Sequence, residues 1–166
     1  TGATASRNYI PAMTEAYYSK IPVIAVTSSQ PTGRIGHNVP QVIDRGHTLN
    51  DISKTSVELP LVQDDESEWT CCINTNKAIL AAIDDGNEGP VHINLITSYN
   101  ADFSVKIIKP VTVIRKHKRV TDKVHVSEGK IGIFCGSHNR WSRKLTDLVD
   151  EFCKKYNGVV ICDHTS

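Results

Sequence analysis

The sequence has little of what marks several classes of protein. Its net charge is only +1 over 166 residues, and aromatic residues make up 6% of it, so a basic, aromatic-rich surface for nucleic acid is not indicated. No apolar run reaches ten residues, whereas a membrane-spanning helix needs roughly 20. The start lacks the order of basic, apolar and small residues that forms a secretion signal. We therefore expect a cytoplasmic protein with neither a membrane nor a nucleic acid as partner.

Motifs for metals, redox chemistry and nucleotides are also missing. The five cysteines form no C-x-x-C pair, which disfavours a zinc site or a thioredoxin-like site. We predict that they are reduced and mostly buried. The sequence has no G-x-G-x-x-G turn and no P-loop lysine.

What the chain does have is alternating helix and strand patterns. Apolar residues recur at three- and four-residue steps in 6–19 and again in 69–83, which predicts two helices. Three β-rich runs, 23–29, 55–59 and 91–96, predict strands. The first strand run does not alternate, which is typical of a strand buried on both faces of a parallel sheet.

A second, shorter unit follows a change in composition. The segment 98–128 is basic and lacks helical periodicity, and we interpret it as an interdomain linker with a solvated charge run. After it, residues 129–166 predict a strand, a helix and a strand. The expected fold class is α/β: a parallel-sheet, three-layer αβα domain, followed by the start of a second, Rossmann-like α/β domain.

Four pieces of the sequence occur in a familiar order. They are the turn, helix and strand of "TGATASRNYIPAMTEAYYSKIPVIAVTSS", the "QP" of the following loop, Gln41, and "GPVHINL" at 89–95. Together they resemble the thiamine-diphosphate enzymes of the acetolactate synthase and pyruvate-oxidase-like group. The "GPVHIN" form is also close to the menaquinone-pathway carboligases. The resemblance is detailed over 1–97 and only topological after 128.

The resemblance implies a domain plan. Residues 1–97 would be the C-terminal part of a pyrimidine-binding domain, 98–128 a linker and 129–166 the beginning of a central domain. The family's cofactor-activating glutamate and its Gly-Asp-Gly diphosphate motif have no match here. We therefore expect no catalytic residue, no metal ligand and no tight cofactor binding in this chain by itself.

The resemblance also implies the chemistry of a complete parent enzyme. That enzyme would use thiamine diphosphate and Mg²⁺ to decarboxylate a 2-oxo acid, and would then protonate the product or transfer it to an acceptor. It would assemble as a homodimer or homotetramer. The alternatives are a nucleotide-binding α/β domain that uses the "CGSHN" turn, and a non-catalytic interaction module.

Three residues are candidates for cofactor contact. By the resemblance, Thr4 and Asn8 lie in the turn that faces the cofactor's pyrimidine ring, and Gln41 reaches the cofactor-bound substrate. A neutral amide can donate and accept hydrogen bonds without bringing a charge that must be desolvated. The alternatives are an ordinary helix start capped by Thr4 or Ser6, and a surface glutamine.

Four further residues are candidates for the substrate channel. Gln30 and Pro31 fall where the family's loop lines that channel. Arg34 and His37 lie nearby and could face an acidic substrate group, or could order the loop or face solvent.

Two histidines have simpler interpretations. His92 lies inside a predicted strand, which favours a hydrogen-bonded core histidine over a catalytic one. His138 follows a strand end, where α/β folds often bind ligands, so a cofactor role is a weaker possibility.

Overall fold

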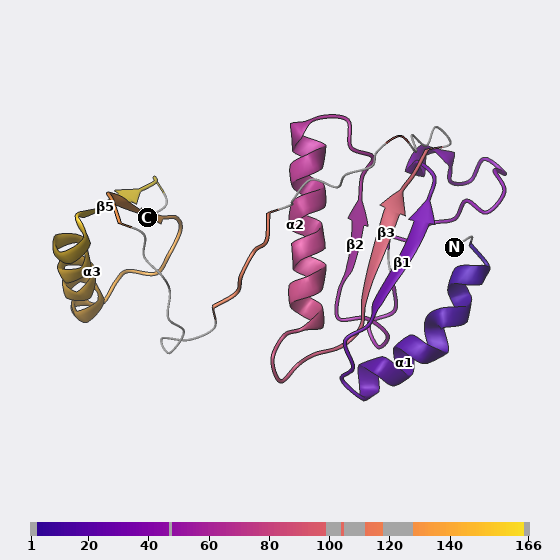
Figure 1. Cartoon of the computed structure of the whole chain (residues 1–166), viewed down its shortest axis with the longest axis horizontal. Coiled ribbons are helices and arrows are strands. Elements are labelled where there is room, and N and C mark those ends of the chain that lie inside the picture. The colour runs from indigo at the N-terminus through magenta and orange to yellow at the C-terminus, as the bar shows by residue number, and fades with distance from the viewer. Residues whose placement is uncertain (1–2, 47, 99–103, 105–111, 118–127, 165–166) are drawn as a thin grey trace. The chain divides into compact units, whose positions relative to one another are not determined.

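A computed structural model describes residues 3–46, 48–98, 104, 112–117 and 128–164. The chain divides into two compact units, Thr1–Lys116 and His117–Ser166 (Figure 1). This division falls within the predicted linker 98–128, most of which lies outside the described residues. Thr1 and Gly2 of the predicted turn also lie outside them.

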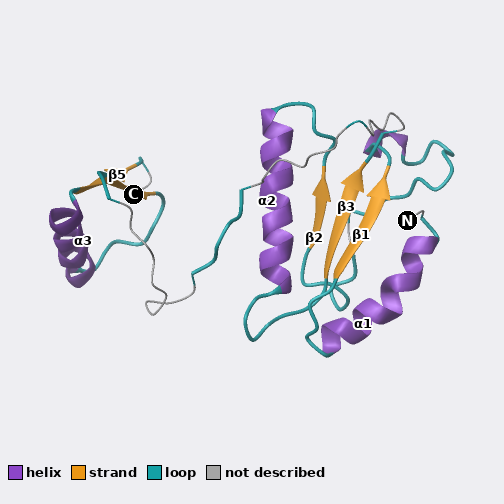
Figure 2. Cartoon of the chain, viewed as in Figure 1, coloured by secondary structure: helices purple, strands orange, loops and turns teal. Residues whose placement is uncertain are grey.

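The first unit contains a parallel three-stranded sheet. Its strands are β1 (Ile24–Ser29), β2 (Ser56–Leu59) and β3 (Val91–Ile96), which confirms the three predicted strands to within one residue. The spatial order is β1-β3-β2, and β3 pairs in parallel with both neighbours (Figure 2). The chain connects β2 to β3 through a helix, as a parallel pair requires.

Helices begin where the sequence provides start signals. The first is a 3₁₀ turn, η1 (Ala5–Tyr9), that continues into α1 (Ile10–Tyr18), with a proline in the first turn of α1. That position tolerates proline because its N–H would have no helical partner. Helix α2 (Asp65–Ala82) starts with a capping box: the Asp64 side chain accepts from the Ser67 amide, and the Ser67 side chain accepts from the Asp64 amide. A short 3₁₀ turn, η2 (Thr32–Arg34), follows β1.

The two helices cover opposite faces of the sheet. The apolar core joins α2 to one face, and its members are Val57, Ala78, Ala82, Val91 and Ile93. On the other face, the ring of Tyr9 from η1 lies 6.2 Å from the ring of His92. Side chains of adjacent strand residues point to opposite faces, so Val91 and His92 mark the two sides. The predicted α/β class with helical layers on both faces is thus observed.

One expectation for β1 is wrong. We predicted a strand buried on both faces, yet Ile24 and Val26 are 48% and 52% exposed. By register they share a face with Val91 and Ile93. Helix α2 packs on β2 and β3, so it leaves the same face of the edge strand β1 uncovered among the described residues.

An asparagine attaches the segment 112–116 to α2. The Asn76 amide donates to the Thr112 carbonyl at 2.9 Å and accepts from the Ile114 amide at 2.8 Å. Just past the end of α2, Asp84 forms an ion pair with Lys116 at 2.9 Å. This segment therefore packs with the first unit, although it belongs to the predicted linker.

We expect Asn76→Ala to release this segment. The Ile114 amide would lose its acceptor, and its hydrogen exchange should become about fivefold faster, because a net hydrogen bond is worth roughly 1 kcal/mol. Hydrogen exchange of the amide, resolved by NMR, measures this. The matched control is Asn74→Ala on the same helix, since the Asn74 side chain donates to Glu58 instead. Equal exchange rates in both variants would contradict the assignment.

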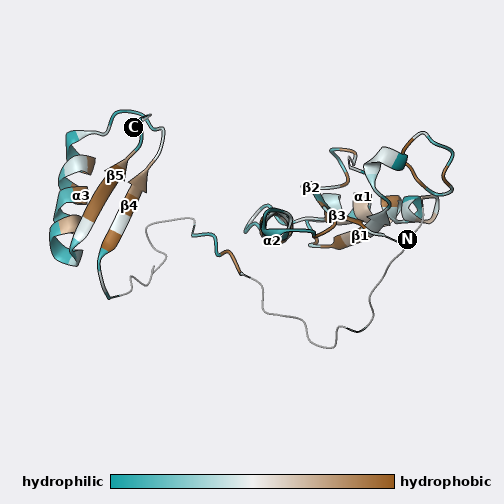
Figure 3. Cartoon of the chain, turned by 90° about the horizontal axis from the view of Figure 1, so that it is seen from above, coloured by the Kyte–Doolittle hydropathy of each residue, from teal (hydrophilic) through white to brown (hydrophobic). Residues whose placement is uncertain are grey.

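The second unit is a single βαβ motif. It consists of β4 (Ile131–Cys135), α3 (Arg143–Tyr156) and β5 (Gly158–Cys162), with β4 and β5 paired in parallel. Ser142 caps the start of α3, and Asn157 ends it with a left-handed backbone at φ 50°, a common helix stop. Figure 3 shows two largely hydrophobic strands beside a more hydrophilic helix.

Two general expectations can be compared with the structure. Within the described part of the chain, no helix combines the length and apolarity that crossing a bilayer requires. The five cysteines are free thiols, but the prediction that most are buried is wrong: only Cys135 is buried and Cys162 is exposed. The other three are intermediate, because the helices that carry them are incompletely covered.

Candidate functional site

The candidate site of the first unit joins the turn before η1 to the loop that follows β1. There the Thr4 amide donates to the Gln41 Oε1 at 3.4 Å, although 37 residues separate them. Figure 1 shows the loop after β1 at the end of the sheet where the strand arrows point. Ligands of α/β sheets bind at this edge. We call Thr4, Gln41 and Arg45 the turn–loop site.

Gln41 is held in a constrained backbone conformation. Its φ of 63° is in the left-handed region, which few residues other than glycine adopt, and such residues gather at functional sites. The Arg45 Nη2 donates to the Gln41 carbonyl at 3.2 Å. This contact fixes the peptide that directs the Gln41 amide toward Thr4.

Arg45 is a cation placed almost entirely inside the protein. It is 4% exposed, and burial is the main cause that lowers its pKa, followed by the charge of Arg7. Burial likewise raises the pKa of the Tyr9 hydroxyl, against the opposing effect of the Arg7 and Arg45 charges. The site therefore contains a buried positive charge behind a neutral amide.

A hydrogen-bonded histidine lies on the helix-covered polar face of the sheet. His92 Nε2 is 2.8 Å from the Thr27 hydroxyl, and its Nδ1 is 2.8 Å from the Ser56 hydroxyl. The residue is 1% exposed. Burial first, and then the charges of Arg45 and Arg7, lower the pKa of His92 to about 4. The expectation of a satisfied core histidine is confirmed, because both ring nitrogens have partners.

Asn94 extends this polar face toward the carboxyl edge. Its Oδ1 accepts from the Thr27 hydroxyl at 2.9 Å and from the Ser29 hydroxyl at 3.0 Å. Its Nδ2 donates to the Glu58 carboxylate at 3.1 Å. One amide thus links all three strands of the sheet.

The remaining candidates of the first unit lie in the exposed loop after β1. The Arg34 Nη1 donates to the Gln30 Oε1 at 2.6 Å, so the two channel candidates are paired. Pro31 precedes η2 and is exposed, as is His37. Asn8 is exposed in η1. The structure brings Thr4 and Gln41 together and pairs Gln30 with Arg34.

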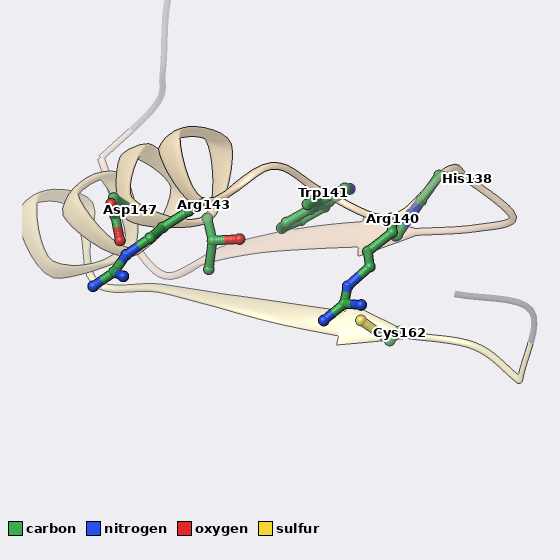
Figure 4. Close-up of a pocket in the computed structure, with 7 residues that line it drawn as sticks. His138, Arg140, Trp141, Arg143, Asp147 and Cys162 are labelled. Carbon is green, nitrogen blue, oxygen red and sulfur yellow. The ribbon is translucent and has the colours of Figure 1, made fainter.

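His138 lines a cavity of about 840 Å³ in the second unit (Figure 4). Its ring stacks on Trp141 with centroids 5.1 Å apart. The other lining residues come from the loop before α3, the start of α3 and the end of β5, and they are Arg140, Arg143, Thr146, Asp147 and Cys162. No group of three potential metal-ligating side chains occurs among the residues that the structure describes.

Sequence reasoning missed Arg45. It selected Arg34 because Arg34 lies closer to the proline-rich loop, yet Arg45 is the buried arginine that contacts Gln41. The only signal was its position four residues after Gln41, and nothing in a polar loop predicts burial. His92 and Asn94 did carry a signal, since they alternate with Val91, Ile93 and Leu95.

The fold and the site define a parallel α/β unit that presents polar loop residues at the carboxyl ends of its strands.

No protein-family model matches the chain. Curated relatives named 2-succinyl-5-enolpyruvyl-6-hydroxy-3-cyclohexene-1-carboxylate synthase do resemble it. The protein of Geobacillus thermodenitrificans is 36% identical over 163 residues, covering 98% of this chain. Those of Bacteroides thetaiotaomicron and Bacteroides fragilis are 35% identical over 119 residues and 29% identical over 166 residues.

These relatives are much longer than the chain. It spans 26% of the Geobacillus protein, 21% of the Bacteroides thetaiotaomicron protein and 29% of the Bacteroides fragilis protein. Their shared name supports the resemblance to the thiamine-diphosphate-dependent enzymes, and the similarity covers both units of this chain.

Proposed function

We propose that this chain forms one wall of the active site of a thiamine-diphosphate-dependent enzyme, and that this enzyme is a carboligase related to the synthases with which the chain shares its sequence. The observation that carries this proposal is the contact of the Thr4 amide with the Gln41 side chain. Two segments that the family resemblance assigns to the cofactor meet there. The acetolactate-synthase-like chemistry, decarboxylation of a 2-oxo acid followed by transfer, is part of the same proposal.

The residues present fit the pyrimidine end of the cofactor. Ala3, Thr4 and Ala5 carry small side chains, which let a flat ring approach the backbone closely. The Gln41 amide can donate to a carboxylate or accept from an amine, and Arg45 holds its peptide in place. The cofactor, when bound, would supply the site that attacks a 2-oxo acid. This chain's own residues would position that substrate and exclude water.

The loop after β1 carries a positive charge that could bind the carboxylate of a 2-oxo acid. The Arg34 guanidinium donates to Gln30 and places a positive charge in this loop, and charge-assisted hydrogen bonds between a guanidinium and a carboxylate are strong. We propose that Pro31 shapes this channel and that His37 lies at its mouth. Mg²⁺ would be held outside this chain, and cofactor binding by the chain alone would be weak.

We propose in addition that the parent enzyme is cytoplasmic and forms a homodimer or homotetramer. The exposed apolar side chains Ile24 and Val26 on an edge strand support further chain packing there, since exposed apolar patches mark interfaces. The nucleotide-binding and interaction-module alternatives find no support in the relatives named here.

The test substitutes Gln41 in the longer protein that carries this segment. We expect Gln41→Ala to lower the turnover of a 2-oxo acid by about 100-fold, because a positioned polar contact in a water-poor site is worth roughly 3 kcal/mol. Carbon dioxide release and product formation, followed separately, measure the two half-reactions. Gln63→Ala, at an exposed position before α2, is the matched control and should keep full activity.

Two results would contradict the proposal. One is full activity of Gln41→Ala with normal dependence on thiamine diphosphate. The other is micromolar binding of thiamine diphosphate by the 166-residue chain alone in calorimetric titration, since that would require a complete cofactor site within it.

A further inference from the structure

In the second unit, each of the two paired strands ends in a cysteine, and the two cysteines are adjacent. Cys135 is the last residue of β4, Cys162 is the last residue of β5, and the two are register partners. Register partners of a parallel pair project from the same face of the sheet. As register partners at the ends of the two strands, the two cysteines are therefore neighbours in the fold.

The two thiols differ in access to solvent. Cys135 is buried, whereas Cys162 is exposed and lines the cavity shown in Figure 4. Burial, and then the neighbouring Cys162, raise the pKa of the Cys135 thiol. A small oxidant that enters the cavity therefore meets Cys162 first, while Cys135 stays protonated behind it.

We propose that Cys135 and Cys162 are a reversible dithiol–disulfide pair that a peroxide oxidises. In the first step the Cys162 sulfur attacks one oxygen of hydrogen peroxide, the O–O bond breaks, and a sulfenic acid and one water form. In the second step the Cys135 sulfur attacks the Cys162 sulfur, the S–S bond forms and the sulfenic oxygen leaves as water. Two thiols and one peroxide thus give one disulfide and two waters.

The sheet makes this disulfide easy to reduce. Neighbouring strands lie about 4.8 Å apart, whereas the Cβ atoms of a relaxed disulfide are about 3.8 Å apart. The strand ends must therefore be drawn together, and strained disulfides are the labile ones. Closure would also move the Cys162 sulfur away from the cavity, which connects the redox state of the pair to the shape of that cavity.

The test is thiol counting by mass spectrometry on the full chain. Five thiols should react with N-ethylmaleimide before oxidation, and treatment with hydrogen peroxide should leave three, with Cys135 and Cys162 in one cross-linked peptide. Dithiothreitol should restore all five. Cys153→Ser is the matched control, because Cys153 lies on α3 and its loss should leave the cross-link unchanged.

Each single substitution of the pair should remove the cross-link. Cys162→Ser, at an exposed position, keeps the test valid if Cys135→Ser fails to fold, and circular dichroism checks the fold of both. Oxidation in urea should lower the yield of this cross-link at least tenfold, because only the fold brings the pair together. Peroxide that produces only sulfinic acid at Cys162, or a cross-link to Cys71, Cys72 or Cys153, would overturn the proposal.

Discussion

Lowering the pH from 6.5 to 4 should reduce the free energy of unfolding by about 3 kcal/mol through His92 alone. The folded pKa is about 4, and the unfolded value is near 6.5. Between these values the unfolded chain binds a proton that the folded chain does not, so the stability present above pH 6.5 is lost on acidification. The cause is burial: a charged ring between Thr27 and Ser56 would have no water and would face the Arg45 charge.

Urea unfolding at several pH values between 7 and 4 measures this loss. His92→Gln keeps a polar side chain that does not titrate. Over this pH range the variant should therefore lose about 3 kcal/mol less of its free energy of unfolding than the wild type loses. His37→Gln is the matched control, because His37 is exposed, and it should retain the full loss. Parallel curves for the wild type and His92→Gln would contradict the assignment.

The polar side of the sheet shows how far the sequence can predict this site. The three strands were predicted to within one residue, and the alternation of His92 and Asn94 with Val91, Ile93 and Leu95 is a further signal in the sequence that the prediction did not use. The partners of those polar groups could not be predicted. Thr27 and Glu58 are neighbours of Asn94 because β3 lies between β1 and β2 in the sheet. Strand order depends on contacts far apart in the chain.

Burial of single residues was harder to predict than the elements themselves. Ile24 and Val26 belong to a β-rich run, but whether a helix covers them depends on which strands α2 packs against. For Arg45 the difference runs the other way. Arginine side chains are mostly exposed, yet Arg45 is buried and donates to the Gln41 carbonyl. The Thr4 to Gln41 contact was accessible from the family resemblance, whereas the arginine that supports it was not.

The largest effect of a single substitution is expected at Asn94. Asn94→Asp keeps the oxygen that accepts from the Thr27 and Ser29 hydroxyls. It replaces the Asn94 NH₂ group, which donates to the Glu58 carboxylate at 3.1 Å, with an oxygen of a second carboxylate. Two like charges at this distance in a buried place should cost about 3–5 kcal/mol at pH 7. Acidification should diminish the loss, because one shared proton restores a hydrogen bond between the two carboxyl groups.

The reciprocal exchange separates this electrostatic cause from simple disruption of packing. In the double variant Asn94→Asp with Glu58→Gln, the amide at position 58 can donate to the carboxylate at position 94, while Thr27 and Ser29 still donate to it. We expect urea unfolding at pH 7 to show that the double variant regains more than half of the lost stability. Glu58→Gln alone should cost about 1 kcal/mol, as for one weakened hydrogen bond. If the double variant is as unstable as Asn94→Asp, then a packing defect and not charge repulsion causes the loss of stability. The hydrogen bonds of the Asn94 amide to all three strands would then not be what stabilises the sheet at this position.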